Sequence, residues 1–228
     1  MRKIFLMLVC VMTLCSCNAN NADKDGDLRD MKIIAYSLGS YFTNCYLVYD
    51  ENAGKACLID PAVYDDEIIN VISSKGLTLE YIILTHGHFD HILGADGFRD
   101  KTGAEIAVYE LETEYLDFLE DDEKFSADIL LKDDDTLTFG GISLKVMHTP
   151  GHSKGSCCFI CGDEKVMFSG DTLFKGTIGR YDLYGGDYDT LMESLQKIKS
   201  IKENYMVYPG HGDSTTLAYE ILQNPYFR

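Results

Sequence analysis

Three histidines and one aspartate lie within six residues of one another in segment 85–91, whose sequence is THGHFDH. The chain has only six histidines, so this segment holds half of them. Neutral imidazole and carboxylate groups are ligands that suit zinc, iron and manganese. Because alternate residues of a tight loop can converge on one side, His86 and His88 can reach one metal ion, while Asp90 and His91 point to a neighbouring position. The segment therefore predicts a metal site.

Three more potential ligands each follow a predicted strand, as segment 85–91 does. Glycine or proline stands beside each of them, which permits tight turns and a close approach of the backbone to a site. An aspartate has two oxygens and could bridge two ions, leaving room for a shared hydroxide as in two-metal hydrolytic sites. The predicted ligands are His86, His88 and His152 for one ion, Asp90, His91 and His211 for a second, and Asp171 as the bridge.

Two other groups of potential ligands are interpreted as structural. His148 precedes the turn before His152 and has no place left in either ligand set. Cys158 and Cys161 form a CxxC pattern, but they lie in an apolar run that is typical of a strand. Residues three apart on a strand point to opposite faces, so this pair is not expected to share a metal or a disulfide. The five cysteines beyond residue 17 are expected to be buried, small hydrophobic residues.

The motif HxHxDH, with HTPGHS, SGDTLF and YPGHG further along the chain, resembles the metallo-β-lactamase-fold hydrolases. The resemblance covers about residues 31–228, nearly all of the expected mature chain. It implies an α/β fold, a four-layer αββα sandwich with the metal site at one edge of its two sheets. It also places Asp60 close to the site, beside the ligands and not among them.

Two further segments resemble the hydroxyacylglutathione hydrolase (glyoxalase II) branch of that family. They are GDTLF at 170–174 followed by GRYD at 179–182, and the C-terminal segment from His211 onward. Longer members of the branch continue with a helical segment that helps to bind glutathione, whereas this sequence stops at Arg228, so it resembles the short members. Arg180 is the candidate to bind an anionic group of the substrate, because a fixed guanidinium suits carboxylates.

The resemblance and the ligands together predict a metal-dependent hydrolase of thioesters or esters. Two divalent ions, with zinc expected and iron or manganese left open, would supply a bridging hydroxide at neutral pH. This hydroxide would attack the carbonyl carbon, and Asp90 and Asp171 would hold and orient it without becoming covalent nucleophiles. A thiolate leaves readily, so no strong general acid is required.

Other functions on the same fold remain open. A non-haem iron persulfide dioxygenase could use His86, His152 and Asp171 as a two-histidine, one-carboxylate triad. A lactonase or another ester hydrolase would use the same ligands as the thioesterase. The Asp171 pattern disfavours a true β-lactamase, and the presence of all seven candidate ligands disfavours a non-catalytic binding protein.

Composition and charge restrict the partners. The chain has 228 residues, 46% hydrophobic and 25% charged, which is typical of a globular protein with a substantial core. Its net charge of −17 repels phosphate backbones and disfavours general nucleic-acid binding. The acidic runs at 110–123 and 133–135 are expected to be solvated surface. A small molecule is therefore the expected partner, and the oligomeric state is left open.

Short strands alternate with helices along the chain, which favours a layered α/β sandwich in one domain. Strands are predicted at 31–36, 44–49, 56–59, 81–84, 106–109, 137–139, 143–147, 155–161, 165–169 and 205–208, and helices at 64–74, 93–102, 110–119, 189–201 and 215–222.

The first thirty residues are predicted to be a signal peptide, 1–16, and a polar tether, 17–30, before a catalytic domain at 31–228. A basic start precedes an apolar stretch at 4–14 that is too short to span a membrane. The sequence LCSC at 14–17 resembles the lipobox of bacterial lipoproteins, which implies cleavage before Cys17, its acylation, and a lipid-anchored protein of the cell envelope. A cleaved signal without lipid remains open, as does translation from Met31, which would give a cytoplasmic protein.

Overall fold

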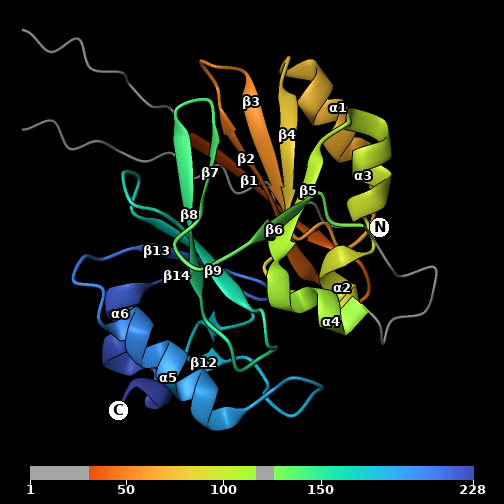
Figure 1. Ribbon diagram of the computed structural model, residues 1–228. Helices are drawn as coiled ribbons and strands as arrows, with labels where there is room; N and C mark the ends of the chain where they lie inside the picture. Colours follow the sequence, from red (N-terminus) through yellow and green to blue (C-terminus); the bar gives the residue numbers. More distant parts are fainter. Residues whose placement is uncertain (1–30, 117–125) are drawn as a thin grey trace, which may run out of the picture.

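The computed structural model describes residues 31–116 and 126–228, and within these ranges it contains two six-stranded sheets that face each other (Figure 1). The predicted signal peptide, the tether with Cys17, and the end of the predicted helix 110–119 lie outside the described residues. None of the helices in the two described ranges is long and apolar enough to cross a bilayer.

The first sheet combines an antiparallel half and a parallel half. Its first three strands are joined by hairpins and pair antiparallel, and the later strands pair parallel. Parallel pairing requires crossovers, and α1 (Asp66–Ser74) and α3 (Ala95–Thr102) supply two of them. In sheet order the strands are β1 (Met31–Leu38), β2 (Thr43–Asp50), β3 (Lys55–Ile59), β4 (Thr78–Ile83), β5 (Glu105–Tyr109) and β6 (Ile129–Leu131).

The second sheet is antiparallel except for the pair β10 and β13. A separate small hairpin of β11 (Leu173–Phe174) and β12 (Thr177–Ile178) follows β10. In sheet order the strands are β14 (Thr215–Thr216), β13 (Met206–Pro209), β10 (Val166–Gly170), β9 (Cys157–Cys161), β8 (Ile142–His148) and β7 (Thr136–Phe139).

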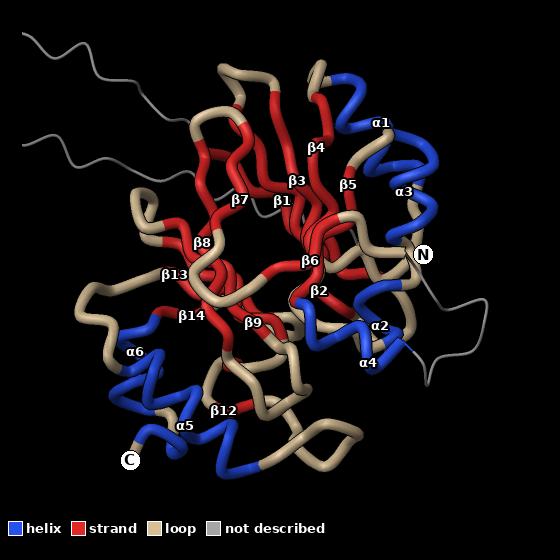
Figure 2. Tube along the Cα trace, viewed as in Figure 1, coloured by secondary structure: helices blue, strands red, loops and turns tan. Residues whose placement is uncertain are grey.

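Helices cover the outer faces of both sheets, which gives four layers (Figure 2). The helices α1 and α3 lie on the first sheet, and α5 (Tyr188–Lys199) and α6 (Leu217–Gln223) lie beside the second. Three groups of buried side chains fill the spaces between the layers. They include Phe98 of α3 in the first group, Phe159 between the two sheets in the second, and Leu195 of α5 in the third. This arrangement confirms the predicted αββα sandwich.

Local capping sets the helix boundaries close to the predicted ones. The side chain of Asp65 accepts a hydrogen bond from the backbone of Glu67, so α1 begins at Asp66 and not at residue 64. The side chain of Asp187 does the same for Thr190 at the start of α5. The strand β9 places Cys158 toward α5 and Cys161 between the sheets, and all five cysteines of the described ranges are free and buried. The prediction that the CxxC pair points to opposite faces is confirmed.

The described part of segment 110–123 differs from the predictions in two details. The predicted helix 110–119 begins with a 3₁₀ turn at Glu110–Glu112, and α4 (Thr113–Leu116) continues it to the last described residue of this segment. Glu112 is also only 1% exposed, whereas the acidic run was expected to be solvated. Buried backbone donors surround its carboxylate, and a pattern of charges along the chain does not show such long-range partners. No prediction covers the short elements α2 (Phe89–Ile92), β6, β11 and β12, because each is too short to show a period. The predicted helix 215–222 begins only at Leu217, because Thr215 and Thr216 form β14.

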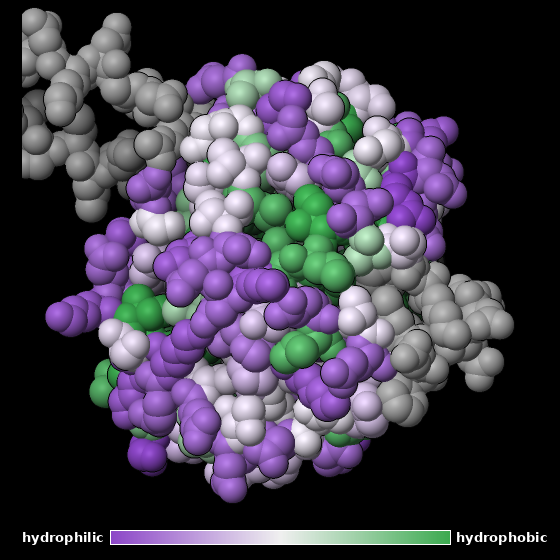
Figure 3. Space-filling model, in the orientation of Figure 1, coloured by the Kyte–Doolittle hydropathy of each residue, from purple (hydrophilic) through white to green (hydrophobic). Residues whose placement is uncertain are grey.

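Most of the molecular face shown in Figure 3 is polar, with an apolar patch over β5 and β6. Leu130 of β6 is half exposed. The polar surface agrees with the strongly acidic composition.

Candidate metal centre

The carboxyl ends of strands from both sheets meet at one edge of the sandwich, and the predicted ligands follow them. His86 and His88 lie in the loop after β4, and α2 then carries Asp90 and His91. The remaining ligands come from the second sheet: His152 lies after β8, Asp171 directly after β10, and His211 after β13. Since β10 and β13 are parallel, both end at the same edge. The structure thus brings together all seven residues singled out in the sequence.

Three buried imidazoles form the first ligand group: His86, His88 and His152. The Nε2 atom of His152 lies 3.2 Å from Nε2 of His86 and 2.8 Å from Nδ1 of His88. Two nitrogens bound tetrahedrally to zinc at about 2.1 Å would be about 3.4 Å apart. The donor set and its spacing therefore fit one divalent ion.

The second ligand group consists of Asp90, His91 and His211. Nε2 of His211 lies 3.3 Å from Nε2 of His91 and 3.3 Å from Oδ2 of Asp90. The distance from His91 Nε2 to Asp90 Oδ2 is 3.7 Å. Two nitrogens and one carboxylate oxygen at this spacing fit a second divalent ion.

Asp171 lies between the two groups. Its Oδ1 atom is 3.5 Å from His91 Nε2, and its Oδ2 atom is 3.6 Å from Nε2 of both His152 and His211. Oδ1 is buried and has no hydrogen-bond partner among the described residues. A buried carboxylate oxygen without a donor is costly, and a cation would stabilise it. The position of Asp171 is that of a bridge between two ions.

Asp60 fixes the histidine tautomers from behind the cluster. It is 1% exposed and accepts hydrogen bonds from the backbone and hydroxyl of Thr85, at 2.8 and 2.7 Å, and from Nδ1 of His91 at 2.9 Å. The Thr85 hydroxyl donates to Asp60, so it accepts from Nδ1 of His86 at 3.0 Å. In its neutral form each of these imidazoles therefore presents an unprotonated Nε2 to the cluster. Although Asp60, His86 and His91 are close enough to hold an ion themselves, hydrogen bonds already occupy the Asp60 oxygens.

Burial keeps the first group uncharged. Desolvation lowers the pKa of His88 to about 3 and the pKa of His86 well below its usual value, and the neighbouring imidazoles add to the effect. Burial also lowers the pKa of His152, against the attraction of Asp171. These three imidazoles are therefore available to a metal ion without losing a proton.

Nearby carboxylates raise the pKa values of the two histidines in the second group. Burial lowers the pKa of His91, but the charges of Asp171 and Asp60 outweigh it and raise the pKa to about 9. The pKa of His211 is also raised, because its hydrogen bond to Asp90 and the charge of Asp171 outweigh burial. Burial raises the pKa of Asp90, yet His211 and His91 bring it down to about 2. A metal ion entering this group must displace a proton.

Arg180 holds the site through its backbone. Its carbonyl oxygen accepts a hydrogen bond from Nδ1 of His152 at 2.7 Å, which fixes that imidazole. Its guanidinium is exposed and donates to both carboxylate oxygens of Asp182, at 2.8 and 3.0 Å. Binding of a substrate anion by Arg180 stays a prediction. His148 lies outside both ligand groups, stacked on Tyr109 with ring centroids 4.2 Å apart.

Sequence analysis missed two residues that contact the centre from other elements. The hydroxyl of Thr43 donates to Oδ2 of Asp90 at 3.3 Å, and its backbone forms a bridge with His211. Asn44 donates to the carbonyls of Pro209 and Gly212, which holds the loop of His211. Both residues begin β2, and no pattern in the sequence marks them. Glu112 is another missed residue, and it binds the loops of the first group.

Comparison with known proteins gives one family. Residues 38–211 match the family model described as the metallo-beta-lactamase superfamily. The hydroxyacylglutathione hydrolase GloC of Haemophilus influenzae is 32% identical to this chain over 208 residues, which cover 86% of this chain and 98% of the relative.

Three solved structures are similar over most of the chain. The B3 metallo-beta-lactamase BLEG-1 superposes with a TM-score of 0.78 and 35% identity, covering 86% of this chain and 99% of its own. TTHA1623 in a di-iron-bound form has a TM-score of 0.75 and 31% identity, covering 84% and 98%. ETHE1 from Myxococcus xanthus has a TM-score of 0.73 and 28% identity, covering 86% and 84%.

Proposed function

This chain belongs to the metallo-β-lactamase superfamily, and on that premise we propose that it is a binuclear hydrolase that cleaves a thioester of the hydroxyacylglutathione type. The observation that carries the proposal is the carboxylate of Asp171, which faces two separate ligand groups at 3.5 and 3.6 Å. The name of GloC supports the choice of substrate class.

When bound, two divalent ions supply hydroxide at neutral pH and polarise the substrate carbonyl. The side chains of the chain position the reactants. Asp90 and Asp171 accept hydrogen bonds from the attacking water and direct its lone pair toward the carbonyl carbon. The hydroxyl of Thr43 holds Asp90 in this orientation. A thiolate leaves without prior protonation, so the reaction needs no strong general acid.

The cations on the loops that adjoin the centre already have carboxylate partners. These ion pairs are exposed and screened by solvent, so a substrate carboxylate can exchange with them. The acidic partners nevertheless disfavour a substrate with several negative charges. The pairs are Lys154 with Glu114, Lys175 with Asp213, and Arg180 with Asp182.

A persulfide dioxygenase is the second candidate, and one observation favours it. Nε2 of His152 lies 3.2 Å from His86 Nε2 and 3.6 Å from Asp171 Oδ2, so these three residues could hold a single iron. This candidate gives no role to Asp90, His91 and His211, which the structure also gathers. The binuclear hydrolase uses both groups.

Release of thiol from S-lactoylglutathione tests the proposal. The metal-loaded full-length chain should release thiol rapidly, and the Asp171→Ala variant should lose this activity while it remains folded. If the wild-type chain carries two ions and releases no thiol, the glutathione thioester is rejected. Lactones, other thioesters and, with iron and oxygen, persulfides would then be assayed.

We also propose that Cys17 carries a lipid that anchors the protein in the cell envelope. In the register of β1 with β2, Leu38 pairs with Thr43 near the metal centre, and Met31 pairs with Asp50 at the far end. A tether that joins the domain at Met31 would thus attach at the end of β1 remote from the metal centre. Incorporation of labelled palmitate that is lost in Cys17→Ser supports the anchor, and a cytosolic, unlabelled protein rejects it.

A further inference from the structure

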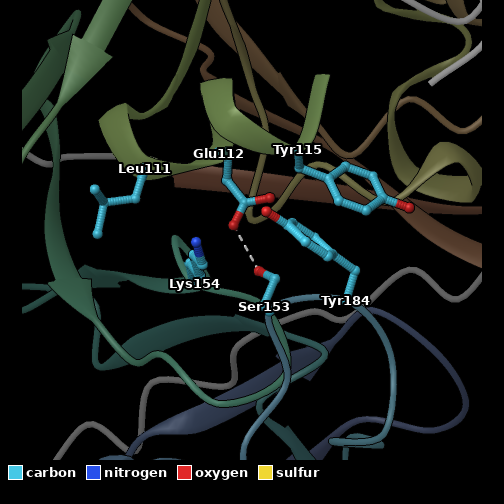
Figure 4. A pocket seen from close by; sticks show the side chains of 7 residues that line it. Leu111, Glu112, Tyr115, Ser153, Lys154 and Tyr184 are labelled. Atoms are coloured by element: carbon cyan, nitrogen blue, oxygen red, sulfur yellow. Dashed lines mark hydrogen bonds between the residues drawn. The ribbon is translucent and has the colours of Figure 1, made fainter. Parts of the chain in front are cut away.

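Glu112 is a buried carboxylate outside both ligand groups. It ends the 3₁₀ turn after β5, and it is 1% exposed. Its Oε2 atom accepts a hydrogen bond from the backbone of Gly87 at 2.7 Å. Its Oε1 atom accepts from the backbone of Gly155 and from the hydroxyl of Ser153, both at 2.6 Å. Figure 4 shows the contact with Ser153, with Tyr115 and Tyr184 on the outer side. Because a buried charge is costly unless it is hydrogen-bonded, these donors keep the carboxylate in place.

The donors belong to the two loops that carry the first ligand group. Gly87 stands between His86 and His88, and Ser153 directly follows His152. One carboxylate therefore links loops that are more than sixty residues apart in the chain. Among the described residues, its hydrogen bonds do not reach the loops of Asp171 or His211.

Both loops pack against Glu112 too closely to take a side chain at their glycines. A Cβ atom on Gly87 would lie 2.7 Å from Oε2 of Glu112. A Cβ atom on Gly155 would lie 2.7 Å from Cγ of Glu112. The glycines thus let the backbone N–H groups approach the carboxylate directly. Ser153 is fixed further by a hydrogen bond of 2.6 Å with the hydroxyl of Ser156.

We propose that Glu112 is a positioning residue: it holds the loops of His86, His88 and His152 so that their imidazoles converge, and it thereby sets the metal affinity of the first group alone. The inference rests on the proposed binuclear function, because it concerns one of the two ions. Partners of this kind outside the ligand sphere typically change metal affinity 10–100-fold when they are removed.

Glu112→Gln is the most direct variant. Its amide keeps one oxygen, but the nitrogen cannot accept a hydrogen bond, so the N–H of Gly87 or of Gly155 must face another donor. Glu110→Gln is the matched control, because Glu110 lies in the same turn and its side chain is 41% exposed. Ser153→Ala is a milder variant, since it removes the hydrogen bonds of that hydroxyl to Glu112 and Ser156 and leaves both backbone contacts with the carboxylate.

The readout is the dissociation constant of each of two ions, measured by competition with a chelator on the full-length chain. In Glu112→Gln one ion should bind about 10–100-fold more weakly and the other as in the wild type. In a His211→Ala background, where only the first group is complete, Glu112→Gln should weaken the binding of the remaining ion by the same 10–100-fold. In a His88→Ala background it should change the remaining ion little.

Three outcomes overturn the inference or separate it from the proposed function. Wild-type affinity for both ions in Glu112→Gln removes the positioning role. Equal weakening of both ions, with a lower melting temperature of the metal-free protein, shows a general structural role, and Ser153→Ala then weakens both ions as well. If the wild-type chain itself never binds two ions, the binuclear function fails, and the assignment of Glu112 to one of two ions fails with it.

Discussion

Replacing Asp60 by asparagine should weaken both metal positions although it removes no proposed ligand. The Oδ2 atom of Asp60 accepts hydrogen bonds from Thr85 Oγ1 and His91 Nδ1. An amide nitrogen in that place is a donor and faces the N–H of His91. His91 then favours the tautomer with its proton on Nε2, the atom that faces the cluster. The Thr85 hydroxyl is released to donate to His86, which favours the same change there.

The size of the effect follows from the two affected imidazoles, one in each ligand group. Loss of such a hydrogen-bonding partner typically weakens metal binding 10–100-fold. This corresponds to about 1.4–2.7 kcal/mol for each ion, since each factor of ten is about 1.4 kcal/mol. The backbone at Asp60 has a φ of 50°, a conformation that asparagine also tolerates, so the substitution itself adds little strain.

Chelator competition at pH 7 measures both dissociation constants, and thermal unfolding of the metal-free protein measures stability. Asp50→Asn is the matched control. Asp50 is 6% exposed and accepts hydrogen bonds from the backbones of Asn52, Ala53 and Gly141, at the end of β2 that is remote from Thr43. It should lower stability and leave both affinities unchanged. The reasoning is refuted if Asp60→Asn binds two ions as the wild type does, or loses no more affinity than Asp50→Asn.

Three further predictions concern the same centre. The pKa of His91 is raised to about 9, so His91 is protonated at neutral pH. A metal ion should therefore bind to the second group about tenfold more tightly per pH unit between pH 7 and 8. A metal affinity that does not change with pH contradicts this prediction. Binding to the first group should change little over that range, since the pKa values of His86 and His88 are lowered. Gly210→Ala should reduce the rate of thiol release at least 100-fold, because the Cβ atom of the new alanine would collide with Oδ1 of Asp171. A wild-type rate would show that the loop of residue 210 moves to accommodate the methyl group. Phe42 is 72% exposed and precedes Thr43, so we expect its ring to contact the substrate. Phe42→Ala should then raise KM several-fold with kcat nearly unchanged, and a wild-type KM would show that the ring does not contact the substrate.

The sequence predicts which side chains gather at the candidate metal centre, because these residues follow strands in short motifs. The segment THGHFDH, directly after a strand, carries four candidate ligands within six residues, and the Gly-His pairs at 152 and 211 and the Gly-Asp pair at 171 stand after other strands. Such local patterns are visible without the fold. The sandwich follows for the same reason, since α1 and α5 have clear apolar periods and buried strands flank them.

The remaining parts of the centre depend on contacts between distant residues. Glu112 looks like one more acidic surface residue until the fold places two loops around it. Thr43 looks like an ordinary strand residue, yet it contacts Asp90, which is 47 positions further along the chain. The expectation for Arg180 concerned its guanidinium, whereas its backbone carbonyl makes the contact with His152. No local pattern reports these partners.

Anomalous diffraction at the absorption edge of the bound metal tests the central claim most directly. In crystals of the metal-loaded chain we expect two peaks, one among His86, His88 and His152 and one among Asp90, His91 and His211. The carboxylate of Asp171 should lie between them. A single peak held by His86, His152 and Asp171, with no density in the second group, would contradict the binuclear hydrolase and favour the mononuclear iron enzyme.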